Sequence, residues 1–215
     1  MKYTIGGILL AGGDGQKIAG GAEVGFLNVG SLPGLARGLM TFEACHEVQT
    51  VVVVADAQRV DTVRAMAHRY GGTKLSAVAP AFQSRTANIA SALAALPPEV
   101  DLLVIHEVSR PLVTANDITE VIQIAARGKG GAATAFLVAG GVRTGPRKRP
   151  TVAVPSTGPI WLVSSPMACL RAFLEKGLTK AKKNRHPISD ETDLMDLAGV
   201  EISLVECGEP NLRIR

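Results

Sequence analysis

Residues 8–17 read ILLAGGDGQK, a short apolar run that passes directly into a glycine-rich turn followed by a lysine. An unbroken apolar run of this kind is typical of a strand buried on both faces of a parallel sheet. Glycines let backbone N–H groups approach an anion without interference from a Cβ atom, and Lys17 adds a positive charge. The spacing matches neither the dinucleotide fingerprint G-x-G-x-x-G nor the P-loop G-x-x-x-x-G-K-[ST]. This glycine loop (residues 11–17) therefore fits either a phosphate-binding loop or a tight connection between two elements.

The composition favours a single globular domain spanning residues 1–215. Hydrophobic residues make up 47% of the chain and charged residues 20%, which suits one domain with a sizeable core. No apolar run approaches the roughly 20 residues that a membrane-spanning helix needs, and the first residues show no signal-peptide pattern. The three cysteines lie far apart without metal-ligand spacing. We therefore expect reduced thiols in a cytoplasmic protein with no membrane partner.

Positive charge is concentrated in two segments. The net charge is +4, and residues 143–149 (RTGPRKR) and 176–185 (KGLTKAKKNR) carry much of the excess. Basic clusters occur on nucleic-acid-binding surfaces, but neither segment has interleaved aromatic residues or a known reader motif. We expect a solvated basic face, or attraction of a small polyphosphate, and no nucleic-acid partner.

Strand and helix patterns alternate along the chain, which predicts a three-layer, Rossmann-like α/β fold with a mostly parallel central sheet. The clearest strand is VQTVVVVA at residues 48–55. Predicted strands cover residues 3–10, 48–55, 75–78, 101–106, 132–138, 160–165 and 200–205. Predicted helices cover residues 32–45, 56–70, 85–96, 116–127, 167–176 and 191–198. Residues 143–159 contain four prolines and break the rhythm, which predicts an excursion such as a hairpin arm.

Two segments that follow predicted strands are expected to meet at one edge of the sheet. The glycine loop follows the first strand, and HEVSRP at residues 106–111 overlaps and follows the strand DLLVIH. Ligands of such sheets bind beyond the carboxyl ends of the strands. We therefore expect His106 and Glu107 to line a site rather than to belong to the core, because a buried charge needs a partner.

Several blocks, in this order, resemble the 2-C-methyl-D-erythritol 4-phosphate cytidylyltransferase family of nucleotidyltransferases. AGGDGQKI at 11–18 resembles the family's A-A-G-x-G-x-R-M, and HEVSRP resembles its H-D-A-A-R-P. Four further blocks match at residues 85–88, 161–166, 189–191 and 211–213. The likeness spans nearly the whole chain. It implies the nucleotidyltransferase fold, transfer of CMP from CTP to a sugar- or polyol-phosphate with Mg²⁺, release of pyrophosphate, and a homodimer joined by an arm at about residues 139–159.

The resemblance also implies roles for individual residues. It makes Lys17 and Arg110 catalytic, Glu107 a metal ligand, and Arg213 a ligand of the acceptor's phosphate. The nucleotide-binding residues that it implies are Ala11, Gly12, Gly13, Asp14, Gly15, Gln83, Arg85 and Asn88.

Some positions depart from the family pattern. The resemblance places the family's second catalytic lysine at Val24, next to Glu23, so one positive charge is missing and a negative one lies nearby. Phe82 stands where a glycine approaches the cytosine, and we expect it to fill the pocket rather than stack on a base. An active cytidylyltransferase is our main hypothesis. The alternative is a catalytically impaired paralogue that binds a nucleotide or has a regulatory role.

Other roles stay open on the residues themselves. Arg85 fits either a bridge between ligand phosphates or a cap for a neighbouring helix. Asp190 and Glu191 stand at a predicted helix start, where we expect them to complement the helix dipole rather than hold a metal.

Overall fold

A seven-stranded sheet forms the centre of the computed structural model, which describes residues 3–13, 16–18, 20–128, 130–146, 148–154, 158–185, 187–208 and 211–215. The strand order is β11-β7-β10-β6-β1-β4-β5. These strands are β1 (Ile5–Leu10), β4 (Thr50–Ala55), β5 (Leu75–Pro80), β6 (Leu102–Glu107), β7 (Gly131–Leu137), β10 (Trp161–Leu170) and β11 (Ile202–Glu206). Only β10 runs antiparallel to its neighbours β6 and β7 within this sheet. The predicted, mostly parallel α/β sheet is confirmed.

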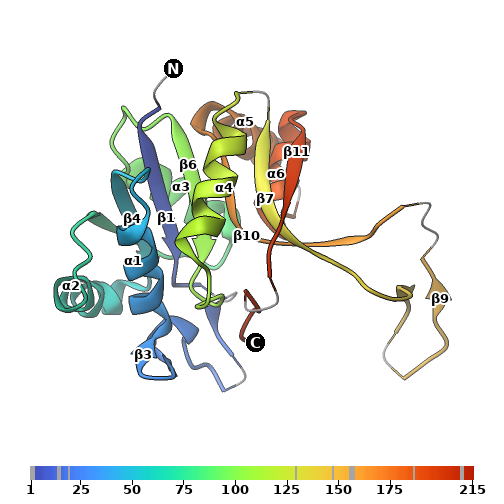
Figure 1. Cartoon of the computed structure of the whole chain (residues 1–215), viewed down its shortest axis with the longest axis horizontal. Coiled ribbons are helices and arrows are strands. Elements are labelled where there is room, and N and C mark those ends of the chain that lie inside the picture. The colour runs from blue at the N-terminus through green and yellow to red at the C-terminus, as the bar shows by residue number, and fades with distance from the viewer. Residues whose placement is uncertain are drawn as a thin grey trace.

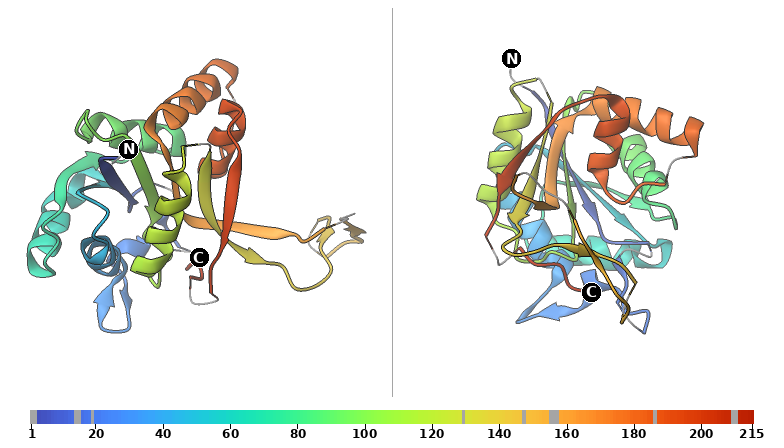
Figure 2. Two further views of the ribbon diagram at one scale, coloured as in Figure 1. Left: turned by 45° about the horizontal axis from the view of Figure 1, so that its top comes forward. Right: turned by 90° about the vertical axis from the view of Figure 1, so that its right-hand side faces the viewer.

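Helices cover both faces of the sheet (Figures 1 and 2). The helices are α1 (Gly34–Ala44), α2 (Val60–Arg69), α3 (Arg85–Ala95), α4 (Ala115–Ala125), α5 (Arg171–Asn184) and α6 (Glu191–Ala198). The buried residues of α1, α2 and α4 form one core cluster with one face of the sheet, and those of α3, α5 and α6 form a second cluster with the other face. The chain therefore forms three layers, as predicted.

The sequence of β4 shows why the sheet is buried on both sides. Val51 and Val53 belong to the first core cluster, and Val52 and Val54 belong to the second. Successive side chains of a strand point to opposite faces, so the β-branched run fills both cores. On β1, a Cβ atom at Gly7 would lie 2.4 Å from a ring carbon of Phe42. Glycine is needed there because α1 packs its phenylalanine directly on the strand.

Two predicted boundaries were wrong. Residues 167–170 were expected to begin a helix but extend β10, because they pair with residues 102–105 of β6. The following helix, α5, runs to Asn184, beyond the predicted end at residue 176. Its buried residues Leu174, Gly177 and Ala181 recur at helical spacing, so the lysine-rich segment continues the helix with its charged side chains outward.

Short elements complete the chain. These are η2 (Val24–Phe26), β2 (Asn28–Val29), β3 (Leu32–Pro33) and η3 (Ala57–Arg59). Strand β3 pairs with β2, which delays the start of α1 by two residues relative to the predicted helix at 32–45.

An arm leaves the body between β7 and β10 and reaches far from it (Figure 1). Within the arm, β8 (Arg143–Thr144) and β9 (Val152–Ala153) pair in antiparallel fashion. Apolar side chains of the arm and of its base are strongly exposed, with 69% for Val152, 59% for Leu162 and 48% for Leu137. The protruding arm is thus confirmed. None of the helices in the described ranges is long and apolar enough to cross a membrane.

Candidate functional site

The segments that follow β1, β4, β5 and β6 meet at one edge of the sheet. The amide of Ala11 donates to the carbonyl oxygen of Val54 in β4 (2.8 Å), and the amide of Val108 donates to that of Leu10 in β1 (3.1 Å). Residues 211–215 join them, because the amide of Ile214 donates to the carbonyl of Ser109 (2.8 Å). The site thus lies where ligands of parallel sheets bind.

The glycine loop lies against the ends of β4 and β5. A Cβ atom at Gly12 would be 2.6 Å from the Cβ of Ala81. Gly13 has a φ of +87°, and its amide donates to the carboxylate of Asp56 (3.3 Å). Among the described residues the amide of Gly12 has no acceptor. Of the predicted phosphate-binding amides, those of Ala11 and Gly13 are therefore engaged within the protein, and that of Gly12 is available. Asp14 and Gly15 lie outside the described residues.

Lys17 stands on the β4 side of the loop. Its Nζ lies 3.5 Å from a carboxylate oxygen of Asp56, and its side chain is 35% exposed. An ion pair this exposed is weak, so the ammonium group can turn to an anionic ligand at little cost. This geometry suits the predicted contact with phosphate.

The segment after β5 is tied to the glycine loop by Asn88. The Oδ1 of Asn88 accepts from the amide of Phe82 (2.6 Å), and its Nδ2 would lie 2.8 Å from a Cβ atom at Gly13. Asn88 is buried, whereas Gln83 is exposed. Phe82 is 51% exposed, so the expectation that its ring fills the pocket was wrong. The backbone carbonyl oxygen of Phe82, rather than its ring, approaches Gly13, 2.8 Å from the position of a Cβ atom there.

The centre of the site is a cluster of arginine and glutamate side chains, hereafter the arginine cluster. The guanidinium of Arg85 contacts Glu191 through two hydrogen bonds (2.7 and 2.9 Å) and Glu107 through a third (2.6 Å). Glu107 also lies 3.8 Å from Arg110 and 3.6 Å from Arg213. Three cations therefore surround one buried carboxylate at the end of β6.

The charges of this cluster reinforce one another. Burial alone raises the pKa of Glu107, but Arg85, Arg213 and Arg110 outweigh burial and hold its pKa below the usual range. Burial likewise lowers the pKa of Arg85, yet the two carboxylates beside it raise its pKa overall. For Arg110, burial prevails and lowers the pKa. Glu107 is thus an anion whose charge fixes the position of guanidinium groups.

The side chain of Glu107 does not fit a magnesium ligand in this arrangement. Both of its oxygens face guanidinium groups, and three adjacent cations repel a divalent cation. In the parts of the chain that the structure describes, no group of three or more His, Cys, Asp or Glu residues could hold a metal ion. The predicted role of Mg²⁺ stays a prediction.

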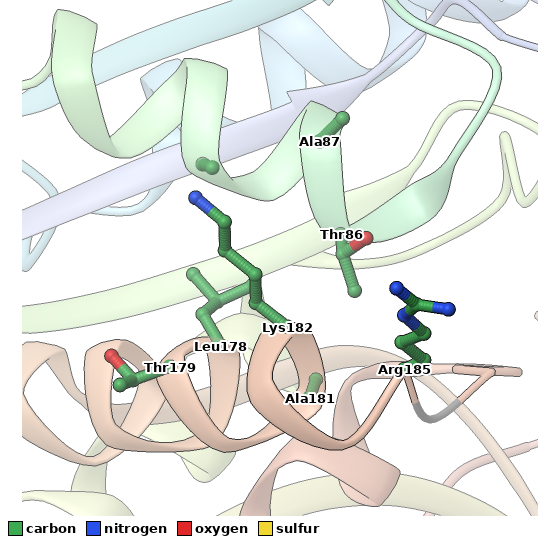
Figure 3. Close-up of a pocket in the computed structure, with 8 residues that line it drawn as sticks. Thr86, Ala87, Leu178, Thr179, Ala181, Lys182 and Arg185 are labelled. Carbon is green, nitrogen blue, oxygen red and sulfur yellow. The ribbon is translucent and has the colours of Figure 1, made fainter.

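Two hollows open on the arginine cluster. One, of about 220 Å³, is lined by the cluster and by residues of β10 and the segment 189–191. The other, of about 510 Å³, is lined by Gln83, Arg85 and Arg213 together with Arg185, Pro187, Ile188 and Ser189. Their linings together include the predicted residues Gln83, Arg85, Glu107, Arg110 and Arg213, and both hollows share Arg85 and Arg213. A third hollow, of about 530 Å³, lies between α3 and α5 and contains none of the predicted site residues (Figure 3).

Helix α6 begins beside this space. The carboxylate of Asp190 accepts from the amide of Thr192 (2.8 Å) and so caps the helix, as expected for a carboxylate at a helix start. Glu191 instead pairs with Arg85. Arg85 therefore links β6 to the first turn of α6.

His106 belongs to the core, contrary to the expectation that it lines the site. It is fully buried. Its Nε2 bonds to the carbonyl of Arg110 (3.0 Å), which only accepts, so Nε2 carries the proton and Nδ1 accepts from the hydroxyl of Ser165 (3.1 Å). The same hydroxyl accepts from the amide of Glu107 (3.2 Å). His106 thus stabilises the conformation of the 107–110 turn through hydrogen bonds from the buried core.

Burial of His106 predicts acid sensitivity of the fold. Burial lowers the pKa of His106 from its usual 6.5 to about 4. Below pH 6.5 the unfolded chain binds a proton that the folded chain does not bind, so stability falls as the pH falls towards about 4. We expect a loss of about 2 kcal/mol between pH 7 and pH 5 from this group. Urea unfolding at both pH values measures it.

Between pH 7 and pH 5, the contribution of His106 to stability can be distinguished from that of the carboxylates. The lowered pKa of Glu107 removes stability only below its unfolded value of about 4.5. In the variant His106→Asn, the pH-dependent loss between pH 7 and pH 5 should shrink markedly, whereas His68→Asn, on the exposed side of α2, should leave it unchanged. An equal loss in all three proteins would contradict the assignment.

Some residues that shape the site were not predicted. The Oε1 of buried Gln16 accepts from the amide of Ser109 (3.2 Å) and joins the glycine loop to the 107–110 turn. Asn211 donates to the carbonyl of Ser165 (2.8 Å), and its own carbonyl accepts from Arg110 (3.0 Å). The sequence offered two signals for these roles: Gln16 lies inside the glycine loop, and Asn211 begins the matched block 211–213.

Comparisons with known proteins agree with this arrangement. A sequence model of the family described as 2-C-methyl-D-erythritol 4-phosphate cytidylyltransferase matches residues 5–215. A protein of that name from Pelotomaculum thermopropionicum is 26% identical over 211 residues, covering 98% of this chain and 88% of the relative. Another of that name, from Halalkalibacterium halodurans, is 26% identical over 217 residues, covering 100% of this chain and 92% of the relative.

Solved structures show the same fold. A 4-diphosphocytidyl-2C-methyl-D-erythritol synthase from Anaerococcus prevotii superposes with a TM-score of 0.84 at 19% identity, covering 99% of this chain and 91% of that one. A 2-C-methyl-D-erythritol 4-phosphate cytidylyltransferase from Thermus thermophilus gives 0.77 at 22% identity, covering 100% and 93%.

Proposed function

Because the chain belongs to the 2-C-methyl-D-erythritol 4-phosphate cytidylyltransferase family, we propose that it transfers CMP from CTP to 2-C-methyl-D-erythritol 4-phosphate and releases pyrophosphate. The observation that carries the proposal is the grouping of Arg85, Arg110 and Arg213 around Glu107, next to a glycine loop that bears Lys17. Two phosphorylated substrates need this concentration of positive charge when they meet.

In the proposed reaction, an oxygen of the acceptor's phosphate attacks the α-phosphorus of CTP. A new P–O bond forms there while the bond from that phosphorus to the bridging oxygen of pyrophosphate breaks. The protein performs little covalent chemistry in such a transfer and acts by positioning and by neutralising charge. We assign Lys17 and the amide of Gly12 to the triphosphate, and Arg110 and Arg213 to the acceptor's phosphate. Mg²⁺ would enter with the triphosphate.

The position of the family's second lysine offers no cation in this chain. Val24 is 1% exposed and belongs to the buried core, so a lysine there would have to bury its charge. The chain therefore needs another cation for the triphosphate if the proposed reaction is to be efficient.

We propose that the arm pairs with a second copy of the chain. The exposed apolar side chains of Val152 and Leu162 lie in the arm and at its base, and the arm projects away from the body (Figure 1). A second arm would bury them, because contiguous apolar surface is rarely left in water. We also propose a cytoplasmic location, since both substrates are small soluble phosphates.

Calorimetric titration with CTP, and separately with ATP, GTP and UTP, tests the proposed function. We expect selective binding of CTP, followed by pyrophosphate release when 2-C-methyl-D-erythritol 4-phosphate is added. Selective CTP binding without turnover would instead favour the impaired paralogue. Absence of binding by any nucleotide would overturn the proposed transfer and leave the family fold retained for another role.

A further inference from the structure

Four charged side chains surround the β4 side of the glycine loop. Lys17 pairs with Asp56 (3.5 Å), and Arg59 pairs with Glu23 (2.6 Å between Nε and Oε2). The backbones of Lys17 and Glu23 form an antiparallel bridge. Residues directly opposite each other in such a bridge place their side chains on the same face. The side chains of Lys17 and Glu23 therefore share one face, and Arg59 contacts Glu23 there.

The side chain of Arg59 is held in position by two contacts, but only some of its hydrogen-bond donors have acceptors in the described part of the chain. Its guanidinium lies over the ring of Phe26, 4.5 Å from the centroid, and its Nε is bound by Glu23. The side chain of Glu23 is buried, whereas that of Arg59 is 39% exposed. Among the described residues, neither Nη atom of Arg59 has a hydrogen-bond acceptor. A guanidinium has five donors in a planar fork, so Arg59 presents a preorganised pair of donors to solvent.

The sheet order places this pair of cations opposite the arginine cluster. Arg59 follows β4, and Glu107 ends β6, and these two strands flank β1 and its glycine loop. In an in-line transfer, the nucleophile and the leaving group lie on opposite sides of the phosphorus. An acceptor phosphate at the β6 side thus leaves the β4 side for the departing pyrophosphate.

We infer that Arg59, positioned by Glu23 and Phe26, binds the β- and γ-phosphates of the nucleotide together with Lys17. This inference rests on the proposed function and names the residue that supplies the cation absent at Val24. Asp56 and Glu23 balance the two cations while no nucleotide is bound. The triphosphate then draws on the free Nη donors of Arg59.

The test compares CTP with CMP, which lacks the β- and γ-phosphates. Because Arg59→Ala alone would leave the buried carboxylate of Glu23 unpaired, the comparison is made in the background of Glu23→Gln. We expect the double variant Glu23→Gln/Arg59→Ala to bind CTP about tenfold more weakly than Glu23→Gln, the usual worth of a charge-assisted hydrogen bond. CMP affinity should not change. Arg59→Lys should weaken CTP binding less, because it keeps the charge but loses the fork.

Arg64→Ala is the matched control, since Arg64 is an exposed arginine on the adjoining helix α2 and its loss should leave CTP affinity unchanged. Equal weakening of CTP and CMP would assign Arg59 a structural role only and overturn the inference, as would unchanged affinity for both. If the wild-type protein binds CTP and CMP equally well, the proposed contacts with the β- and γ-phosphates are wrong. If it binds neither nucleotide, the proposed function is wrong as well.

Discussion

Arg85→Ala is expected to lower the free energy of unfolding by about 3–5 kcal/mol and to abolish CMP transfer. Removal of one partner from a buried ion-pair group leaves its carboxylates without compensation. Glu191 would lose both of its hydrogen bonds from Arg85, and Glu107 would lose its shortest one. Urea unfolding at pH 7 and an assay of pyrophosphate release measure the two effects.

A second variant separates stability from binding. In Arg85→Ala/Glu191→Gln the unpaired charge at the start of α6 is removed, so part of the lost stability should return while transfer stays absent. Arg64→Ala, which removes the same charge from the surface, should change neither quantity. If the free energy of unfolding of Arg85→Ala equals that of the wild type, the ion pairs of the arginine cluster do not stabilise the fold as their geometry indicates.

Lys17→Ala is expected to reduce kcat for CMP transfer by about 10²–10³-fold, the usual cost of losing a group that stabilises charge in the transition state. Its ion pair with Asp56 is exposed, so the thermal midpoint should stay within the range of an ordinary surface substitution. Steady-state kinetics with saturating CTP and acceptor give kcat, and calorimetry gives the midpoint.

Lys17→Arg is the conservative counterpart. It keeps the positive charge, and most of kcat should remain because positioning and charge, not proton transfer, are assigned to this residue. Lys180→Ala, on the exposed side of α5, controls for the loss of net charge. A kcat within a factor of two or three of the wild type in Lys17→Ala would remove Lys17 from the reaction.

The fold was predictable because its signals are local. The run VVVV in β4 requires burial on both faces, and the glycine loop follows β1 as the pattern indicates. The same holds for Glu107 at the end of β6 and for Arg110 in the turn that follows. Predicted boundaries were wrong where the end of an element depends on pairing with a distant strand. The last residues of β10, for example, pair with β6.

The interior of the site was less predictable, because its contacts join distant residues. Arg85 and Glu191 are 106 positions apart, and the local sequence around either residue does not predict the other as its partner. The burial of His106 depends on a hydroxyl supplied by Ser165 from a strand that runs in the opposite direction. Arg59 was not singled out, since nothing in its local sequence shows that Glu23 lies within reach.

The order in which the sheet is assembled has a consequence for synthesis on the ribosome. Strands β1, β4, β5 and β6 are neighbours in space and all lie within residues 5–107, so they can pair while the rest of the chain is still being translated. The carboxylate partner of Arg85 on α6, and the residues from 211 onward that bind the 107–110 turn, leave the exit tunnel much later. During that interval a nascent chain has most of its sheet but no finished arginine cluster, and it cannot yet hold two phosphorylated substrates.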